Sequence, residues 1–313
     1  MARIGIFPAS GALGTSTLTH LLSDFPNDRV TLVNRFPEKI PRAYLDNGVT
    51  TRQASYESSP EELQTAFSGI ETLFLISYPS HVHQYRAKVQ IKAIEAAHRA
   101  GVKHIFYSSL GFASIEKDTT KAEVMGAHLD SEAYLKEVAR KDPSFSWTSI
   151  REGLYSESFP IYTAFFDLKA PVSEIFIPHD GSGPGISWVK RDELGEATAR
   201  LIASYARDPS SFEYTDRIVT LTGPKAWSLS ETVQVLARVT GTQVRIQHVT
   251  VEEYSKLPKV LEKFGSEQLA TTWATAWEAI RDGETEAANG TLRDILGRDP
   301  ENFEKTIENL ARH

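Results

Sequence analysis

Short runs of β-type residues, several of them apolar, alternate with helix-like patterns through the first half of the chain. The runs expected to form strands cover residues 3–7, 30–34, 49–54, 72–77, 104–108 and 146–151. Helical spacing or capping signals between them predict helices at about 15–24, from 59 onward, at 82–100 and at about 121–140. Such alternation is typical of βαβ units, so the sequence predicts an α/β protein with a Rossmann-type, doubly wound parallel sheet.

Two of these helices carry signals at their ends. Ser59 offers an N-cap hydroxyl ahead of Pro60 and two glutamates, and Gly101 is expected to end the helix over 82–100. The apolar residues of that segment, Val82, Tyr85, Val89 and Ala93, lie three to four positions apart, which is helical spacing. The mixed run Arg86–Lys103 is expected to form its solvated face.

Beyond Arg151 the pattern is less regular. Residues 155–185 are aromatic and rich in proline and glycine, and a strand edge followed by a helix is expected over 187–201. A strand is expected at 218–221, with mostly helical segments over 228–240 and 251–310. This part is predicted to be a smaller, mostly helical lobe that shapes a substrate pocket.

Composition narrows the class of protein. The chain has 313 residues, a formal net charge of -7 and no cysteine, so it offers no disulfide, thiolate nucleophile or sulfur-ligated zinc. The acidic balance argues against nucleic acid as a partner. No apolar run of membrane-spanning length and no signal peptide is evident, so we expect no membrane association and a cytoplasmic location.

A glycine-containing loop follows the first strand and opens the first helix. Backbone N–H groups of such a loop can approach a pyrophosphate, and the helix N-terminus favours its negative charge. Proline at position 8 replaces the first glycine of the G-x-x-G-x-x-G pattern and removes one N–H. The residues expected at the pyrophosphate are Ser10, Gly11, Ala12, Leu13 and Gly14; an ordinary βα turn is the alternative.

The second strand ends in Asn34 and Arg35, with Lys39 nearby. NAD binders usually place an acid at this point, whereas a guanidinium favours the 2′-phosphate of NADP. We therefore expect NADP(H) as cofactor, with Asn34, Arg35 and Lys39 binding it. A solvent-exposed arginine is the alternative for Arg35.

Ligands of such sheets lie beyond the carboxyl ends of the strands. This rule adds residues from the loops after four later strands to the expected cofactor site: Ser55, Ser77, Tyr78, Ser108, Ser109, Gly153, Leu154 and Tyr155. The expected domains are a dinucleotide-binding domain of residues 1–154, to which 186–222 return, and a substrate-binding lobe of residues 155–185 and 223–313.

The chain resembles the NmrA-like family of atypical short-chain dehydrogenases/reductases. The phosphate loop resembles that family's G-A-T-G-x-L-G, and similar stretches occur over nearly the whole chain, at residues 32–37, 74–77, 100–109, 151–157, 188–194, 221–224 and 296–300. The family includes redox-sensing regulators, NADPH-dependent quinone reductases and oxidoreductases of fungal secondary metabolism. His128-Leu129-Asp130-Ser131-Glu132 resembles a pattern of the quinone-reductase branch, which implies His128 where many relatives carry an active-site lysine.

Typical short-chain reductases use Tyr-x-x-x-Lys, but Tyr134-Leu135-Lys136 has the wrong spacing. The usual proton relay is therefore expected to be absent. The expected catalytic residues are His128, as a proton donor, and Tyr155, which would orient substrate or nicotinamide. A packing or capping role is the alternative for both.

Three functions follow as hypotheses. The leading one is NADPH-dependent hydride transfer to a quinone or an aromatic, polyketide-like carbonyl or enone. The others are a non-catalytic NADP(H) sensor that binds a partner protein, and a non-redox isomerase or cyclase. The expected partner is a small aromatic substrate; a homodimer and a protein partner stay open, and His81 and His83 are not expected to bind a metal. Trp273 and Trp277 are expected to pack within the small lobe or to form an aromatic wall for substrate.

Overall fold

The computed structural model describes residues 2–113 and 118–312. It divides into two compact units: Met1–Ser109, Ala127–Glu152 and Asp192–Val219 form the first, and Leu110–Gly126, Gly153–Arg191 and Thr220–His313 form the second. The expected domain boundaries differ from this division mainly at 110–126 and 186–191, which belong to the second unit. Within the described residues, no helix is long and apolar enough to cross a membrane.

A seven-stranded sheet organises the first unit, with the order β3-β2-β1-β4-β5-β6-β8. The pairings β1–β2, β2–β3, β1–β4 and β4–β5 are parallel. The α/β Rossmann-type fold predicted from the sequence is thereby confirmed. The strands are β1 (Ile4–Phe7), β2 (Val30–Asn34), β3 (Thr50–Gln53), β4 (Thr72–Ile76), β5 (His104–Leu110), β6 (Ser146–Glu152) and β8 (Arg217–Leu221).

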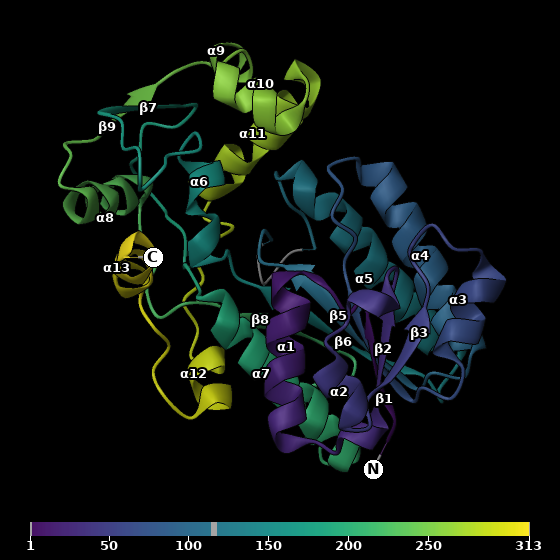
Figure 1. Cartoon of the computed structure of the whole chain (residues 1–313). Helices are drawn as coiled ribbons and strands as arrows, with labels where there is room; N and C mark the ends of the chain where they lie inside the picture. The colour runs from purple at the N-terminus through teal and green to yellow at the C-terminus, as the bar shows by residue number, and fades with distance from the viewer. Residues whose placement is uncertain (1, 114–117, 313) are drawn as a thin grey trace. The chain divides into compact units, whose positions relative to one another are not determined.

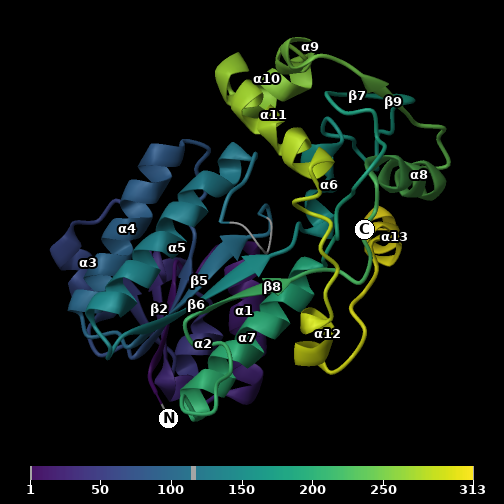
Figure 2. The same cartoon turned by 180° about the vertical axis from the view of Figure 1, so that it is seen from behind.

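Helices cover both faces of this sheet (Figures 1 and 2). One face carries α3 (Pro60–Phe67), α4 (His83–Arg99) and α5 (Glu123–Lys141), and the other carries α1 (Gly11–Asp24) and α7 (Arg191–Arg207). A short helix, α2 (Arg42–Asp46), precedes β3. The buried core beneath α3, α4 and α5 joins strand residues to helix residues, among them Phe7, Leu75, Tyr107, Phe67, Ala93 and Leu135.

The predicted helix signals act as expected at two ends. Ser59 caps α3 by accepting a hydrogen bond from the Glu62 N–H, and the Glu62 carboxylate accepts one from the Ser59 N–H. Gly101 has a φ of 89° and follows the last turn of α4. Helix α1 begins at Gly11, four residues before the predicted start at about Thr15, so it reaches into the glycine loop.

Of the four apolar residues that give this segment its helical spacing, only Val89 and Ala93 are buried in α4. Val82 and Tyr85 are 52% and 41% exposed, whereas Arg86 is buried although its run was expected to face solvent. Gln90 is also buried: its side chain accepts a hydrogen bond from the Tyr78 N–H (2.9 Å) and donates one to Ser131 Oγ (2.8 Å). Polar side chains can occupy an interior helix face when each polar group finds such a partner.

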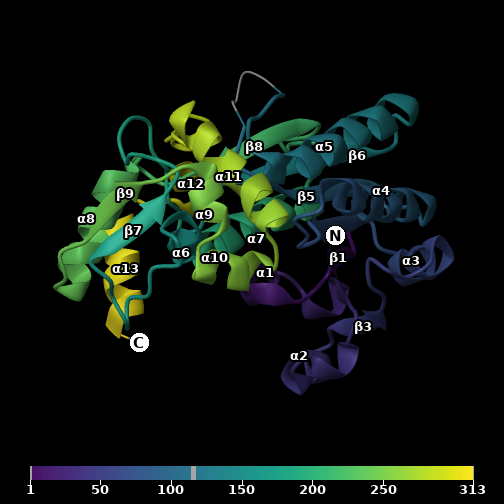
Figure 3. The same cartoon turned by 90° about the horizontal axis from the view of Figure 1, so that it is seen from above.

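The second unit contains a two-stranded parallel sheet that the sequence pattern did not predict. Strand β7 (Glu174–Ile177) pairs with β9 (Arg245–His248), and α8 (Leu229–Thr240) lies next to β9 (Figure 3). These strands are four residues long and lie in the part of the chain where the apolar pattern is irregular. The predicted helical character is confirmed: the helices are α6 (Phe159–Tyr162), α8 (Leu229–Thr240), α9 (Val251–Ser255), α10 (Pro258–Phe264), α11 (Glu267–Arg281), α12 (Thr291–Leu296) and α13 (Phe303–Arg312).

Aromatic residues form much of the interior of the second unit. Trp277 is 1% exposed and packs edge-on against Tyr254, at 4.7 Å between ring centroids. Trp273 is buried and stacks on Phe264 at 5.8 Å. Both tryptophans therefore pack within the core of this unit.

Candidate cofactor site and buried polar network

The phosphate loop joins β1 to α1 next to the ends of β2 and β4. The Ala9 N–H donates to the Val33 carbonyl (3.0 Å), and the Ser10 N–H donates to the carbonyl of Pro8 (2.8 Å), which follows a cis peptide bond. A Cβ added at Gly14 would lie 3.0 Å from Ile76 Cδ1 and 3.4 Å from the Pro8 carbonyl oxygen, so α1 starts in close contact with β4 and the loop. The helix begins where the strand order reverses between β1 and β4, the point where open α/β sheets bind ligands.

Two further features of this loop suit a diphosphate. Gly11 has a φ of 82°, a left-handed conformation that side-chain-bearing residues rarely adopt. The first turn of α1 carries no acidic side chain, and its initial N–H groups lack intrahelical acceptors, as at any helix start. Ser10, Gly11 and Ala12 are exposed, whereas Leu13 and Gly14 are buried. The loop therefore presents backbone donors and no competing negative charge.

Three neighbouring residues form a cationic platform after β2. The guanidinium carbon of Arg35 lies 5.2 Å, and Nζ of Lys39 4.5 Å, from the centre of the Phe36 ring. Phe36 is 42% exposed, and Asn34 Oδ1 accepts a hydrogen bond from the Arg35 N–H (2.8 Å). Asn34, Arg35 and Lys39 were expected here from the sequence, whereas Phe36, whose ring keeps both cations on one surface, was not.

Ser55 and Tyr78 meet at one acidic residue that sequence reasoning also missed. Tyr78 Oη donates to Glu57 Oε1 (2.7 Å), and Ser55 Oγ accepts from the Glu57 N–H (3.2 Å). The hydrogen bond to Glu57 raises the pKa of Tyr78 to about 12 and lowers the pKa of the Glu57 carboxyl. The positive charge of Arg35 is a smaller cause of the lowered pKa of Glu57.

His128 lies in a buried chain of hydrogen bonds that begins after β4. Arg86 donates from one guanidinium nitrogen to Ser77 Oγ (3.1 Å) and to His128 Nε2 (2.7 Å), and His128 Nδ1 is 3.0 Å from Tyr107 Oη. His128 is 2% exposed. Burial first, and then the positive charges of Arg86 and Arg151, hold the pKa of His128 well below its usual range.

This environment fixes the tautomer of His128. Arginine can only donate, so Nε2 accepts and the ring hydrogen is assigned to Nδ1, which donates to Tyr107 Oη. Burial is also the main cause that raises the pKa of Tyr107. Both rings are therefore neutral over the physiological range, and both His128 nitrogens are occupied.

Ser109 belongs to a second buried network. Its Oγ donates to Glu132 Oε1 (2.7 Å), as does Ser149 Oγ (2.7 Å), and Arg151 holds Glu132 through contacts of 3.1 and 2.6 Å. Glu132 and Arg151 are each 1% exposed, and Ser108 is 3% exposed. The hydroxyl of Ser109 is thus directed at the ion pair.

The expected residues of the second unit lie after β6. A Cβ at Gly153 would lie 2.8 Å from both the Leu221 carbonyl oxygen and Val189 Cγ2, so close packing requires glycine there. The Leu154 carbonyl accepts from the Val189 N–H (2.9 Å). Tyr155 is half-buried, with the Arg191 guanidinium 5.9 Å from its ring centre. His128 belongs to the first unit and Tyr155 to the second.

Two other candidates have local partners. Tyr134 Oη donates to Glu95 Oε1 (2.8 Å), and burial together with this bond raises its pKa to about 12. His83 Nε2 is 2.8 Å from Asp130 Oδ2. Within residues 2–113 and 118–312, no group of three or more histidine or acidic residues is arranged to hold a metal ion.

The sheet order and the glycine loop at its switch point define a Rossmann-type protein of the dinucleotide-binding class. A family model described as the NmrA-like family matches residues 1–287. The chain belongs to the NmrA-like family.

Two curated proteins are similar over most of the chain. The NmrA-like family domain-containing oxidoreductase flvB of Aspergillus flavus is 32% identical over 301 residues, which cover 95% of this chain and 91% of that protein. Quinone oxidoreductase 2 of Escherichia coli is 31% identical over 255 residues, 80% of this chain and 79% of that protein.

Solved structures agree with this family. The NADPH-dependent quinone oxidoreductase QOR2 of Escherichia coli, complexed with NADPH, superposes with a TM-score of 0.79 at 26% identity and covers 98% of this chain and 99% of its own. The triphenylmethane reductase of Citrobacter sp., complexed with NADP(H), gives a TM-score of 0.74 at 25% identity and covers 98% of this chain and 99% of its own.

Proposed function

We propose that the protein is an NADP(H)-dependent oxidoreductase that delivers hydride to a quinone or to an aromatic carbonyl or enone. The observation that carries this proposal is the pairing of an acid-free glycine loop with the Arg35–Phe36–Lys39 platform at the next strand end. The loop suits the diphosphate, and the two cations suit an additional phosphate on the ribose. The NADPH and NADP(H) complexes of the similar structures support the same cofactor.

In this proposal each part of the loop region has one task. The N–H groups at the start of α1 bind the diphosphate, and Arg35 with Lys39 binds the 2′-phosphate while Phe36 supports both cations. Ser55, Ser77 and Tyr78, which follow β3 and β4, are proposed to line the next part of the cofactor. Reduced nicotinamide, when bound, supplies a hydride.

The proton for a reduced quinone comes from water in this proposal. A quinone that accepts a hydride becomes a hydroquinone monoanion, which needs one proton and no strongly placed protein acid. His128 is a positioning residue: its neutral ring ties Arg86, and through it Ser77, to Tyr107. Tyr155 is proposed to orient substrate or nicotinamide. The Tyr-Lys relay of typical short-chain reductases plays no part.

The experiment is to measure NADPH consumption with a panel of benzoquinones, naphthoquinones and aromatic enones. We expect turnover with at least one quinone, and turnover should be faster with NADPH than with NADH. The His128→Gln variant should retain turnover, because Gln can accept from Arg86 and donate to Tyr107. Absence of NADPH consumption with the whole panel would contradict the proposed reaction.

One observation favours a second function, an NADP(H)-sensing regulator. Both nitrogens of His128 are occupied and its pKa is lowered, so this residue supplies no imidazolium for acid catalysis. A sensor needs dinucleotide binding alone. It predicts tight NADP(H) binding without turnover, and a partner affinity that changes with the dinucleotide.

A further inference from the structure

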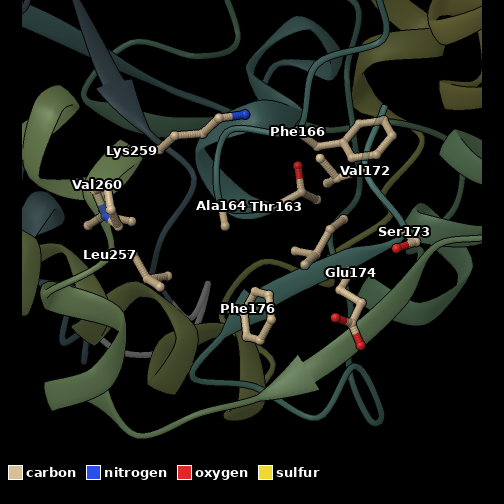
Figure 4. A pocket seen from close by; sticks show the side chains of 12 residues that line it. Thr163, Ala164, Phe166, Val172, Ser173, Glu174, Phe176, Leu257, Lys259 and Val260 are labelled. Atoms are coloured by element: carbon tan, nitrogen blue, oxygen red, sulfur yellow. The ribbon is translucent and has the colours of Figure 1, made fainter. Parts of the chain in front are cut away.

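A cavity of about 400 Å³ lies within the second unit, and all of its lining residues belong to that unit (Figure 4). Its walls come from residues 163, 164 and 166 after α6, from residues 172–176 at the start of β7, and from residues 257–260 at the start of α10. Small-molecule sites typically have volumes of roughly 300–1,000 Å³. These residues are distinct from the phosphate loop and from the His128 network.

The lining is mostly apolar and partly aromatic. Phe166 is buried at 2% exposure, whereas Val172 and Phe176 remain 42% and 38% exposed beside the cavity. Exposed apolar side chains around a cavity release water when a ligand covers them. Two phenylalanine rings in one lining favour a flat aromatic ligand.

The backbone of one wall is held in an unusual conformation. Ala164 and Phe165 have φ values of 48° and 60°, in the left-handed region that bulky residues rarely occupy. The Phe165 N–H donates to the Pro160 carbonyl (2.6 Å), and its ring packs edge-on against Phe264 at 5.7 Å between centroids. Strained residues fixed by such contacts occur preferentially at ligand sites. This wall is therefore a preformed part of the cavity.

Lys259 supplies a positive charge at the cavity. Its neighbours Lys256 and Lys263 have carboxylate partners at 2.6 and 3.3 Å, but Lys259 has none among the described residues. Figure 4 shows its side chain extending along one edge, with Phe176 and Leu257 across the cavity from it. The acid of the lining, Glu174, accepts a hydrogen bond from Gln247 (2.7 Å).

We propose that this cavity binds a flat, largely apolar molecule that carries one carboxylate or phenolate, with the anionic group at Lys259. The apolar walls bind the ring system, and the ammonium selects the charged end. The proposal does not rest on the redox function, because binding here needs neither cofactor nor turnover.

The test uses 2-naphthoate and its neutral analogue 2-naphthylmethanol, each titrated calorimetrically into the full chain without cofactor. We expect saturable 1:1 binding of naphthoate. Lys259→Met should weaken naphthoate binding by about two- to fivefold, which is the range for a partly exposed ion pair. The affinity for naphthylmethanol should stay unchanged. Lys263→Met is the matched control on the same helix and should bind both probes as the wild type does.

A second variant locates the probes. Val172→Trp should fill the cavity and weaken the binding of both probes. No saturable naphthoate binding, equal affinity in Lys259→Met, or full affinity in Val172→Trp would each overturn the proposal. NADPH binding by the wild type is measured separately, so absence of NADPH binding with intact naphthoate binding would contradict the proposed function alone.

Discussion

The guanidinium of Arg86 donates a 2.7 Å hydrogen bond to Nε2 of His128, and both side chains are buried. A cation that faces the acceptor nitrogen of a buried imidazole opposes protonation of that ring. The contact therefore makes His128 a neutral connector between Arg86 and Tyr107. It also ties the loop after β4 to the interior, because Arg86 bonds to Ser77 as well.

The neutral state of His128 gives the stability of the fold a pH dependence. Its folded pKa is lowered, so below about pH 6.5 the unfolded chain binds a proton that the folded chain excludes. Stability should thus fall with decreasing pH by about 1.4 kcal/mol per pH unit for this residue, between the unfolded and folded pKa values. Urea unfolding of the wild type and of His128→Gln at pH 5 to 7 measures the effect.

The His128→Gln variant should lose the part of the pH dependence of the unfolding free energy that His128 contributes. His104, whose pKa is lowered to about 3 by burial, contributes a slope of the same sign and should keep it in the variant. An unchanged slope in His128→Gln would mean that His128 is protonated in the folded protein or exposed to water.

The buried Glu132–Arg151 pair should be costly to break. Glu132→Ala leaves the Arg151 guanidinium without its carboxylate and removes the acceptor of Ser109 and Ser149. We expect a loss of about 3–5 kcal/mol in the free energy of unfolding, measured by denaturant titration. Glu137→Ala is the matched control, because Glu137 forms an exposed ion pair with Lys141 on the same helix. Similar losses in both variants would contradict the assignment.

Gly11 should serve both the fold and the cofactor. Its φ of 82° disfavours a side chain, although an added Cβ would meet nothing within 4 Å. Gly11→Ala should cost about 1–2 kcal/mol of stability through backbone strain, and should also weaken NADPH binding. Gly69, with a φ of 73° and equally open surroundings, is the control: Gly69→Ala should lose similar stability and retain NADPH affinity. Equal NADPH affinity in the two variants would contradict the role of the loop.

Much of the sheet was predictable because β1, β2 and β4 are mostly apolar runs between helix signals, as expected for strands buried on both faces. The face of α4 was not predictable from spacing. Val82 and Tyr85 continue the apolar period but remain exposed, while Arg86 and Gln90 point inward. Their partners are Ser77, in the loop after β4, and His128 and Ser131, in α5. Tertiary partners of this kind cannot be read from the periodicity of one helix.

The candidate site was predictable where a local motif carries it. The loop from Pro8 to Gly14 and the Arg35 position both follow directly from strand ends. Phe36 and Glu57 were missed because their roles depend on how Arg35 and Tyr78 pack against them. The hydrogen bonds of the two His128 nitrogens could not be predicted from the sequence either, because their partners, Arg86 and Tyr107, lie 42 and 21 positions away along the chain.

The central claim is that the platform after β2 selects NADPH, and a titration of NADPH and NADH into wild-type protein and Arg35→Ala tests it most directly. We expect the wild type to prefer NADPH. Arg35→Ala should bind NADPH about ten- to hundredfold more weakly, because it lacks the charged hydrogen bonds of the guanidinium, and its affinity for NADH should change little. Equal NADPH affinity in the two proteins, or no binding of either dinucleotide by the wild type, would contradict the account.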